Sequence, residues 1–144
     1  MIIRPVSFDD CSGMATLTQE LGYPTNFDKM SEILRLVMGN PDHEIYIAEI
    51  DDQLAGYVHL VSGGSSEDQF MIDIAAMMVD TNFRDRGVGN AFIHKAEESA
   101  KSRQANLLRI RTSLITPEAY DFFEHRGFVN LSSQEVFVKE LNQD

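Results

Sequence analysis

Three apolar segments follow one another in the middle of the chain, at residues 44–50, 53–61 and 71–79. They read EIYIAEI, QLAGYVHLV and MIDIAAMMV, and each has the length and composition of a β-strand. Asp51 and Asp52 stand between the first two segments, as the two residues of a hairpin turn would. Because strands joined by short loops pair antiparallel, the sequence predicts an antiparallel meander at the centre of the fold.

Two helices are predicted before this meander. A short strand at 1–6 comes first, and the helices then begin after Ser7 or Asp9 and after Asn26 or Asp28. Each of these side chains can accept a hydrogen bond from the first turn of a helix. Glycine and proline follow both helical patterns and are expected to end them.

Strands and helices alternate after the meander. Residues 89–103 have helical periodicity, 106–111 form a strand, 116–126 a helix that ends at Gly127, and 134–141 a last strand. The order of elements is βααβββαβαβ. This order predicts an α/β or mixed α+β fold with one central, mostly antiparallel sheet.

Composition limits the classes of protein to which the chain can belong. Its 144 residues, 43% of them hydrophobic, suit a single domain with one core. The net charge of −11 argues against a nucleic-acid binder, which normally carries a basic surface. An acidic surface instead favours a cationic small molecule or a basic peptide as partner.

The sequence also suggests a compartment. Cys11 is the single cysteine, so no internal disulfide can form, and a reducing environment is the simpler interpretation. No apolar run approaches the roughly 18 residues that a membrane helix needs. We therefore expect a cytoplasmic protein with no membrane partner.

A cationic turn with two glycines joins the third strand of the meander to the next helix. It reads RDRGVG, from Arg84 to Gly89. The first N–H groups of a helix have no intrahelical partner and carry the positive end of the helix dipole, so they can bind a phosphate. Gly87 would let a ligand approach the backbone, and Arg86 adds positive charge. A tight turn with solvated arginines is the alternative.

Two common nucleotide motifs do not match this turn. A P-loop requires glycine, four residues and then Gly-Lys-Ser or Gly-Lys-Thr, a string that the sequence lacks. A dinucleotide fingerprint would place a third glycine at position 92, which is Phe92. We therefore expect a phosphate-containing ligand of another class.

The turn resembles the Arg/Gln-x-x-Gly-x-Gly/Ala motif of the GNAT superfamily of acyl-CoA-dependent N-acyltransferases. The later segment AYDFFEHRGF is similar to the family's A-x-x-F-Y-E-x-x-G-F segment. The stretches ELGYP, NPDHEIYIAE and EVFVKEL resemble small bacterial members, so the resemblance covers essentially the whole chain. It implies helices on both faces of a sheet that splays between the fourth and fifth strands.

The resemblance implies acetyl-CoA as co-substrate and no metal. The pantetheine arm would lie in the splay and bind main-chain groups of the fourth strand. The Met78 N–H would stabilise the negative charge that develops on the acyl oxygen. The implied cofactor-binding residues are Met77, Met78, Val79, Arg84, Asp85, Arg86, Gly87, Val88, Gly89, Asn90, Thr116 and Phe123.

Asp73 is the candidate general base. It lies where many relatives carry a glutamate that accepts the proton of the amine, directly or through water. Aspartate is one methylene shorter, which favours a bridging water. Alternatively, Asp73 points to solvent or anchors a neighbouring loop.

One departure from the family concerns the leaving group. The tyrosine that usually protonates the departing thiolate is replaced by Phe123, which cannot donate a proton. Two hypotheses follow from the sequence. The chain is an N-acetyltransferase that acts in a ternary complex on a primary amine of a small molecule or peptide, a cationic one being favoured by the acidic composition, or it is a weak or inactive CoA-binding sensor. A homodimer through the last strand is compatible with both.

Overall fold

The computed structural model of the protein describes residues 1–62, 70–110 and 117–129. Contacts between Cα atoms divide the chain into two units, Met1–Arg111 and Thr112–Asp144. Thr116 and the strand expected at 134–141 lie outside the described residues. The single domain expected from length and composition stays a prediction.

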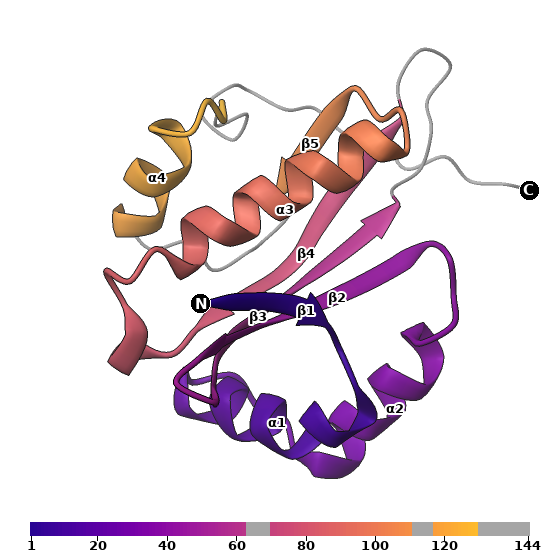
Figure 1. Cartoon of the computed structure of the whole chain (residues 1–144), viewed down its shortest axis with the longest axis vertical. Coiled ribbons are helices and arrows are strands. Elements are labelled where there is room, and N and C mark those ends of the chain that lie inside the picture. Colours follow the sequence, from indigo (N-terminus) through magenta and orange to yellow (C-terminus); the bar gives the residue numbers. More distant parts are fainter. Residues whose placement is uncertain (63–69, 111–116, 130–144) are drawn as a thin grey trace, which may run out of the picture. The chain divides into compact units, whose positions relative to one another are not determined.

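A mixed sheet forms the centre of the first unit (Figure 1). In the described residues it has five strands in the order β1-β2-β3-β4-β5. Neighbours from β1 to β4 pair antiparallel, whereas β4 and β5 pair parallel. The predicted meander and fold class are confirmed. The strands are β1 (Ile2–Pro5), β2 (His43–Ile50), β3 (Gln53–Ser62), β4 (Met71–Val79) and β5 (Leu107–Ile110).

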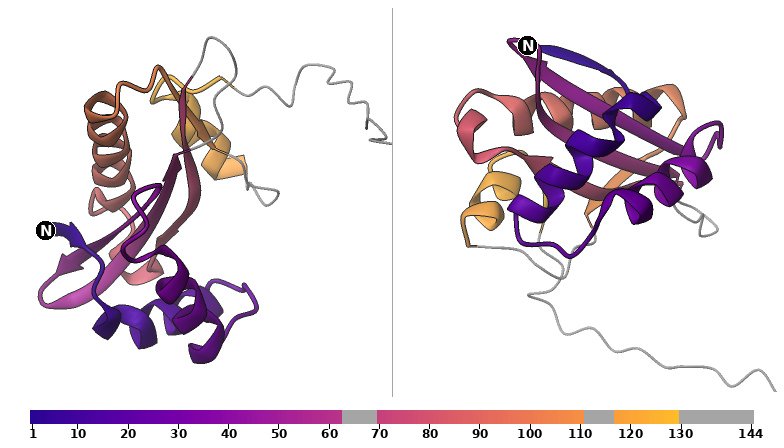
Figure 2. Two further views of the ribbon diagram at one scale, coloured as in Figure 1. Left: turned by 90° about the vertical axis from the view of Figure 1, so that its right-hand side faces the viewer. Right: turned by 90° about the horizontal axis from the view of Figure 1, so that it is seen from below.

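Helices cover both faces of this sheet, as the sequence predicted. Helices α1 (Cys11–Glu20) and α2 (Phe27–Val37) lie on one face and α3 (Val88–Ser102) on the other (Figures 1 and 2). Short 3-10 turns at Phe8–Asp10 and Thr81–Phe83 precede α1 and α3. Within the described ranges no helix combines the length and the apolar character needed to cross a bilayer.

The cap of α2 and the hairpin turn form where the sequence placed them. The side chain of Ser7 accepts from the Asp9 N–H and caps the 3-10 turn Phe8–Asp10, whereas α1 begins after Asp10 without a side-chain cap. The side chain of Asn26 accepts from the Lys29 N–H at 2.8 Å at the start of α2, as predicted. Asp51 and Asp52 have φ angles of 51° and 61°. Positive φ at both central residues is the requirement of a type I′ hairpin, whose twist matches that of the flanking strands.

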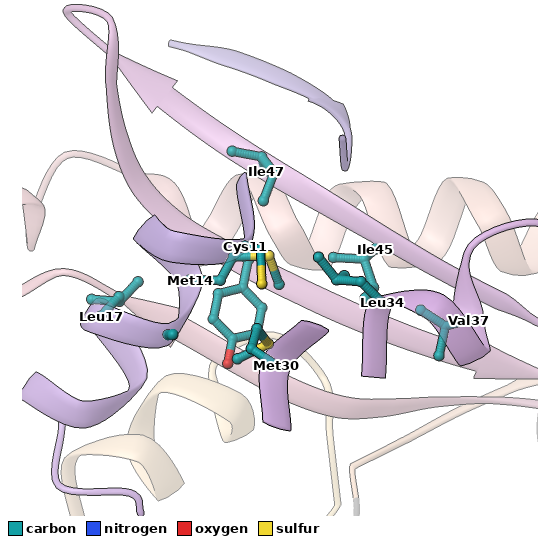
Figure 3. Packing of buried hydrophobic residues seen from close by; sticks show 10 residues of the cluster. Cys11, Met14, Leu17, Met30, Leu34, Val37, Ile45 and Ile47 are labelled. Atoms are coloured by element: carbon teal, nitrogen blue, oxygen red, sulfur yellow. The ribbon is translucent and has the colours of Figure 1, made fainter. Parts of the chain in front are cut away.

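One apolar core fills the space between the sheet and the first two helices. We call it the α1–α2 cluster. Its Tyr57 is only 5% exposed, and its hydroxyl hydrogen-bonds Thr18 Oγ1 at 2.7 Å, so the polar tip is satisfied inside the core. The members are Cys11, Met14, Ala15, Leu17, Met30, Leu34, Val37, Ile45, Ile47 and Tyr57 (Figure 3).

A second apolar layer lies between α3 and the opposite face of the sheet. Four residues on the inner side of α3 are buried, namely Phe92, Ile93, Ala96 and Ala100. Arg103, which follows the end of α3, is half-buried. It donates to Ser62 Oγ at 2.7 Å and to the Pro41 carbonyl at 2.6 Å. Its guanidinium thus ties the end of α3 to the sheet.

Strand β4 contains an irregularity in its middle. Ala76 pairs with His59 and Ile74 pairs with Leu60, so Ala75 is an extra residue on β4 without an opposite partner on β3. A bulge of this kind bends a strand and increases its local twist. The two halves of β4 are therefore directed differently.

In the described residues, β5 pairs with the first half of β4. The parallel ladder runs from Met71 to Ile74 on β4 in the described residues. Residues 75–79 continue beside β3 alone within the described part of the chain. The bulge thus coincides with the end of the described β4–β5 pairing, which fits the predicted splay between the fourth and fifth strands.

The second unit contains α4 (Pro117–Glu124), which ends in a turn at Gly127. Gly127 has a φ of 88°, and the Phe128 N–H donates to the Phe123 carbonyl at 3.1 Å. This geometry is typical of a glycine C-cap and confirms the predicted end of the helix. The ring of Phe123 contacts those of Phe122 and Phe128 edge to face.

Gly56 allows β3 to approach β4 closely. It lies opposite Val79, and a Cβ on it would overlap the Met78 carbonyl oxygen and lie 3.2 Å from a ring carbon of Phe92. Neither the backbone of β4 nor a fully buried ring can move aside cheaply. Glycine at this position therefore sets the distance between the two strands.

Replacing Gly56 with alanine is expected to lower the free energy of unfolding by about 1–3 kcal/mol, the usual cost of overpacking. Urea denaturation measures this change. Gly13→Ala is the matched control, because a Cβ there would meet only the side chain of Leu54, with its terminal methyl nearest at 3.2 Å. Alanine also favours a helix by about 1 kcal/mol, so this control should be neutral or stabilising. Equal urea midpoints for Gly56→Ala and wild type would contradict the packing argument.

Candidate functional site

The turn before α3 places main-chain donors beside two arginines. Gly87 is the N-cap of α3 and has a φ of 82°, and no side chain caps the helix. Val88 and Gly89 are the first two residues of α3, so their N–H groups have no carbonyl one turn earlier within the helix. Arg84 and Arg86 are exposed. The turn therefore combines a helix start with two cationic side chains.

Its other residues have different surroundings. Val88 is 2% exposed, so it fixes the first turn of α3 to the core and can offer a ligand only its main chain. Asp85 has a φ of 66°, a left-handed conformation that is uncommon outside glycine and asparagine. Asn90 is exposed, as are Asp85 and Gly87. The structure thus brings the predicted phosphate-binding residues together on one turn.

The direction of the main-chain groups on β4 follows from its pairing with β3. The Asp80 N–H donates to the Ala55 carbonyl at 2.8 Å, so these two residues form a hydrogen-bonded pair. Hydrogen-bonded and non-hydrogen-bonded pairs alternate along an antiparallel ladder. Met78 therefore directs its N–H and C=O groups toward β3. Met77 and Val79 direct theirs away from β3, toward the side of β4 on which β5 pairs with residues 71–74.

Cross-strand pairing also identifies the face of the sheet that carries Asp73. Met78 pairs with Tyr57 and packs against the α1–α2 cluster. His59 and Val61 follow at two-residue steps along β3, so their side chains point to the same face. Asp73 pairs with Val61, and its side chain consequently lies on the face that α1 and α2 cover.

On this face Asp73 forms a two-pronged ion pair with Arg109 of β5. Arg109 Nε donates to Asp73 Oδ1 at 2.7 Å, and Arg109 Nη2 donates to Asp73 Oδ2 at 2.9 Å. The side chains are 15% exposed for Asp73 and 35% exposed for Arg109. The hydrogen bonds to Asp73 raise the pKa of Arg109 above its ordinary value. Asp73 therefore neither lies free in solvent nor anchors a loop, since it joins two strands.

Two histidines continue this line of polar side chains. His43 Nδ1 and His59 Nε2 are 2.9 Å apart, so one ring donates to the other. Burial, with a smaller effect of His43, lowers the pKa of His59 to about 4. His59 is therefore uncharged near neutral pH. We call the four residues His43, His59, Asp73 and Arg109 the polar row, because they lie on one face of the neighbouring strands β2, β3, β4 and β5.

The sequence did not identify Arg109 as a residue of the site or as the partner of Asp73. An arginine within the apolar segment NLLRIR was the available signal, but its partner depends on the parallel register of β4 and β5. Tyr57, two residues before His59 on the same face of β3, is buried in the α1–α2 cluster and is not open to an acceptor. Phe123 belongs to the second unit, and Thr116 lies outside the described residues.

No group of three His, Cys, Asp or Glu side chains is placed to hold a metal ion in the part of the chain that the structure describes. The groups that the described residues offer to a ligand are charged side chains and main-chain donors. These are the exposed turn before α3, the edge of β4 at Met77 and Val79, and the polar row.

Comparison with known proteins identifies the class. A model of the acetyltransferase (GNAT) family matches residues 12–128, which is most of the chain. The chain therefore belongs to the GNAT family of acetyltransferases, as its motifs predicted, and its domain is of the acyltransferase class.

Individual relatives are distant. An uncharacterised N-acetyltransferase of Methanocaldococcus jannaschii is 28% identical over 94 residues, which is 64% of this chain and 42% of that protein. N-acetylaspartate synthetase of Xenopus tropicalis is 24% identical over 109 residues, or 76% of this chain and 39% of that protein. The chain thus spans about two fifths of the length of these relatives.

A solved structure shows the same fold. The aminoglycoside 6'-N-acetyltransferase of Acinetobacter haemolyticus superimposes with a TM-score of 0.79. It is 15% identical, and the match covers 99% of this chain and 100% of that one. At such low identity the similarity shows the fold alone.

The pKa of His59 predicts how stability depends on pH. Its folded value of about 4 lies below the ordinary 6.5, so the unfolded chain takes up a proton that the folded chain does not. The contribution of His59 is therefore fully present above pH 6.5 and is lost progressively as the pH falls toward 4. In His59→Gln, the free energy of unfolding should fall less over this range. Urea denaturation at several pH values measures the slope.

His94→Gln is the matched control, because His94 is exposed on α3. Its replacement should leave the dependence of stability on pH unchanged. The same acid slope in wild type and His59→Gln would contradict the assignment of an uncharged, buried His59.

Proposed function

We propose that the chain transfers the acetyl group of acetyl-CoA to a primary amine of a small molecule or a peptide, by direct attack in a ternary complex. The observation that carries this proposal is the course of β4. The main-chain groups of Met77 and Val79 are directed away from β3. The strand ends at Val79, and the exposed, cationic turn before α3 follows within a few residues. Such an edge suits an amide-containing arm, and the helix start suits the diphosphate attached to it.

In this proposal the diphosphate of CoA binds at the turn of residues 84–90. The N–H groups of Val88 and Gly89 donate to its oxygens, and Arg84 and Arg86 add charge-assisted hydrogen bonds. Gly87 and Gly89 permit a close approach because they carry no side chain. The pantetheine arm then runs along β4 and pairs with main-chain groups of Met77 and Val79, as an added strand would.

The register of β4 supports Met77, in place of Met78, as the oxyanion donor. The Met78 N–H is directed into the ladder with β3, whereas the Met77 N–H points to the edge along which the thioester would lie. A fixed N–H aimed at the acyl oxygen stabilises the negative charge that develops during attack. We therefore assign this donor to Met77, while Met78 packs its side chain on the α1–α2 cluster.

Asp73 receives the amine in this proposal. An alkylamine is mostly protonated at neutral pH, since the reference pKa of lysine is about 10.4, so it must lose a proton before it attacks. Each oxygen of Asp73 accepts one hydrogen bond from Arg109 and retains a second lone pair. The proton passes from the bound ammonium to solvent through a water at Asp73, and the neutral nitrogen attacks the acyl carbon.

As the C–N bond forms, the nitrogen releases its second proton to water, and the C–S bond then breaks. The leaving group is the thiolate of CoA, whose conjugate thiol has a reference pKa of about 8.5. Such a thiolate can depart without a general acid and take a proton from water. Phe123 in place of the family's tyrosine therefore slows the reaction without preventing it.

A CoA-binding sensor without turnover is the second candidate, and Phe123 favours it. Assays of thiol release with polyamines, aminoglycosides, amino acids and lysine peptides separate the two functions. Tight CoA binding with no release from any of these amines would support the sensor. A cytoplasmic location and a homodimer stay predictions from the sequence.

The CoA site can be tested by titration calorimetry. Wild type is expected to bind CoA, and Arg84→Ala to weaken binding about tenfold through loss of a charge-assisted hydrogen bond. Lys101→Ala is the matched control, since this exposed lysine lies in the last turn of α3, at the opposite end of the helix from the proposed site. This variant should bind CoA as wild type does. Folded wild-type protein that fails to bind CoA at millimolar concentration would end the proposal.

The oxyanion assignment can be tested with two neighbouring proline variants. Proline removes a main-chain N–H and is tolerated in a strand only where that N–H is outside the ladder. Met77→Pro should remain folded, bind CoA and lose about a hundredfold in kcat. Met78→Pro should instead lower the melting temperature, because it removes a hydrogen bond to β3. Near-normal kcat in folded Met77→Pro would refute the assignment.

A further inference from the structure

The Asp73–Arg109 pair lies close to the last described rungs of the β4–β5 ladder. Its two residues are paired in register, and the described ladder ends one rung further on, at Ile74 and Ile110. In the proposed reaction the thioester lies beside the next residues of β4, so any acceptor amine must pass close to this pair. A guanidinium and a carboxylate therefore stand together where the acceptor is received.

We propose that Arg109 makes the acceptor site selective for an amine that also carries a carboxylate on the same or the adjacent carbon, which is the chemistry of a free amino acid. This inference rests on the proposed transfer reaction and adds the class of acceptor to it. The ammonium group is held by Asp73 and the carboxylate by Arg109.

The ion pair retains enough hydrogen-bonding capacity for this role. A guanidinium has five N–H groups, and the pair with Asp73 engages one on Nε and one on Nη2. The remaining N–H groups on Nη1 and Nη2 can donate to a second carboxylate. The side chain of Arg109 is 35% exposed, so these donors can be reached from solvent. An ammonium can donate to the second lone pairs of Asp73 at the same time.

The charges along the polar row also argue against a purely cationic acceptor. His59 is uncharged near neutral pH, and Asp73 and Arg109 balance each other. His43 lies on the far side of His59 and adds no negative charge. Within the polar row, the described side chains therefore carry no net negative charge. A polyamine would meet the positive charge of Arg109 here, whereas a zwitterion meets a complementary partner for each of its charges.

The alternative role for Arg109 is purely structural, as a clamp that fixes the register of β4 and β5. Both roles predict slower transfer when Arg109 is replaced. Only carboxylate recognition predicts that the loss depends on whether the acceptor carries a carboxylate. The ratio of kcat/KM for an amino acid to kcat/KM for its primary amide therefore separates the two roles.

The experiment compares a panel of free amino acids with their primary amides, with acetyl-CoA as donor. The amide keeps the size of the acceptor, and loss of the carboxylate lowers the pKa of its amine, so without recognition the amide should react faster. Wild type is expected to favour the free amino acid by about tenfold to a hundredfold, the range of a charged hydrogen-bonded pair. Arg109→Met should reduce this ratio to one or below, mainly by raising KM for the amino acid.

Two further variants control the result. Arg109→Lys keeps the charge without the planar fork and should restore part of the preference. Arg103→Met removes an arginine that is paired with Glu44 on the other face of the sheet, and it should leave the ratio unchanged. Thermal melts of all variants confirm that they are folded.

Other outcomes decide between the inference and the reaction on which it rests. The inference is overturned if wild type acetylates amides or diamines in preference to free amino acids. It is also overturned if Arg109→Met slows the reaction of acids and of amides by the same factor. Transfer to amines with no preference for acids leaves the transferase proposal standing and removes the inference. If no amine is acetylated, calorimetry of the CoA complex with an amino acid and its amide decides. An Arg109-dependent preference for the acid supports the inference, and its absence overturns it.

Discussion

Main-chain hydrogen bonding along β4 is the constraint on which the rest of the site depends. On one side β3 pairs with the whole strand, while on the other β5 pairs with it only from Met71 to Ile74 in the described residues. Backbone donors and acceptors need partners, so the groups that β3 does not engage are disposed to receive a ligand with its own amides. The bulge at Ala75 lies where this change occurs, and α3 begins a short turn beyond the end of the strand.

Packing on the two faces of the sheet holds this strand in place. On one face, the α1–α2 cluster receives Met78 and the buried Tyr57. On the other face, Phe92 of α3 packs close to Gly56, where only a glycine fits. A strand held on both faces cannot shift its register without moving side chains out of two cores. The main-chain groups of β4 are therefore fixed before any ligand arrives, which is the condition for electrostatic stabilisation at low reorganisation cost.

Much of the fold was predictable because its signals are local. Hairpin residues such as Asp51 and caps such as Asn26 act within a few positions along the chain, and the structure confirms them. The turn before α3 was equally predictable, since its glycines and arginines lie within six consecutive residues. Pairing between distant strands was not predictable in the same way. Arg109 became relevant only through its register with Asp73, and the direction of Met77 only through its register with β3.

The sequence by itself determined the order of the elements, the apolar faces of the helices and the cationic helix start, because each depends on residues that are neighbours along the chain. Tertiary structure decided which charges meet on the sheet, that Arg103 is drawn inward, and which N–H groups of β4 turn away from β3. Those outcomes depend on a register between segments tens of residues apart. A shift of one residue would exchange the faces of a strand, and only the combined packing of both cores selects one register.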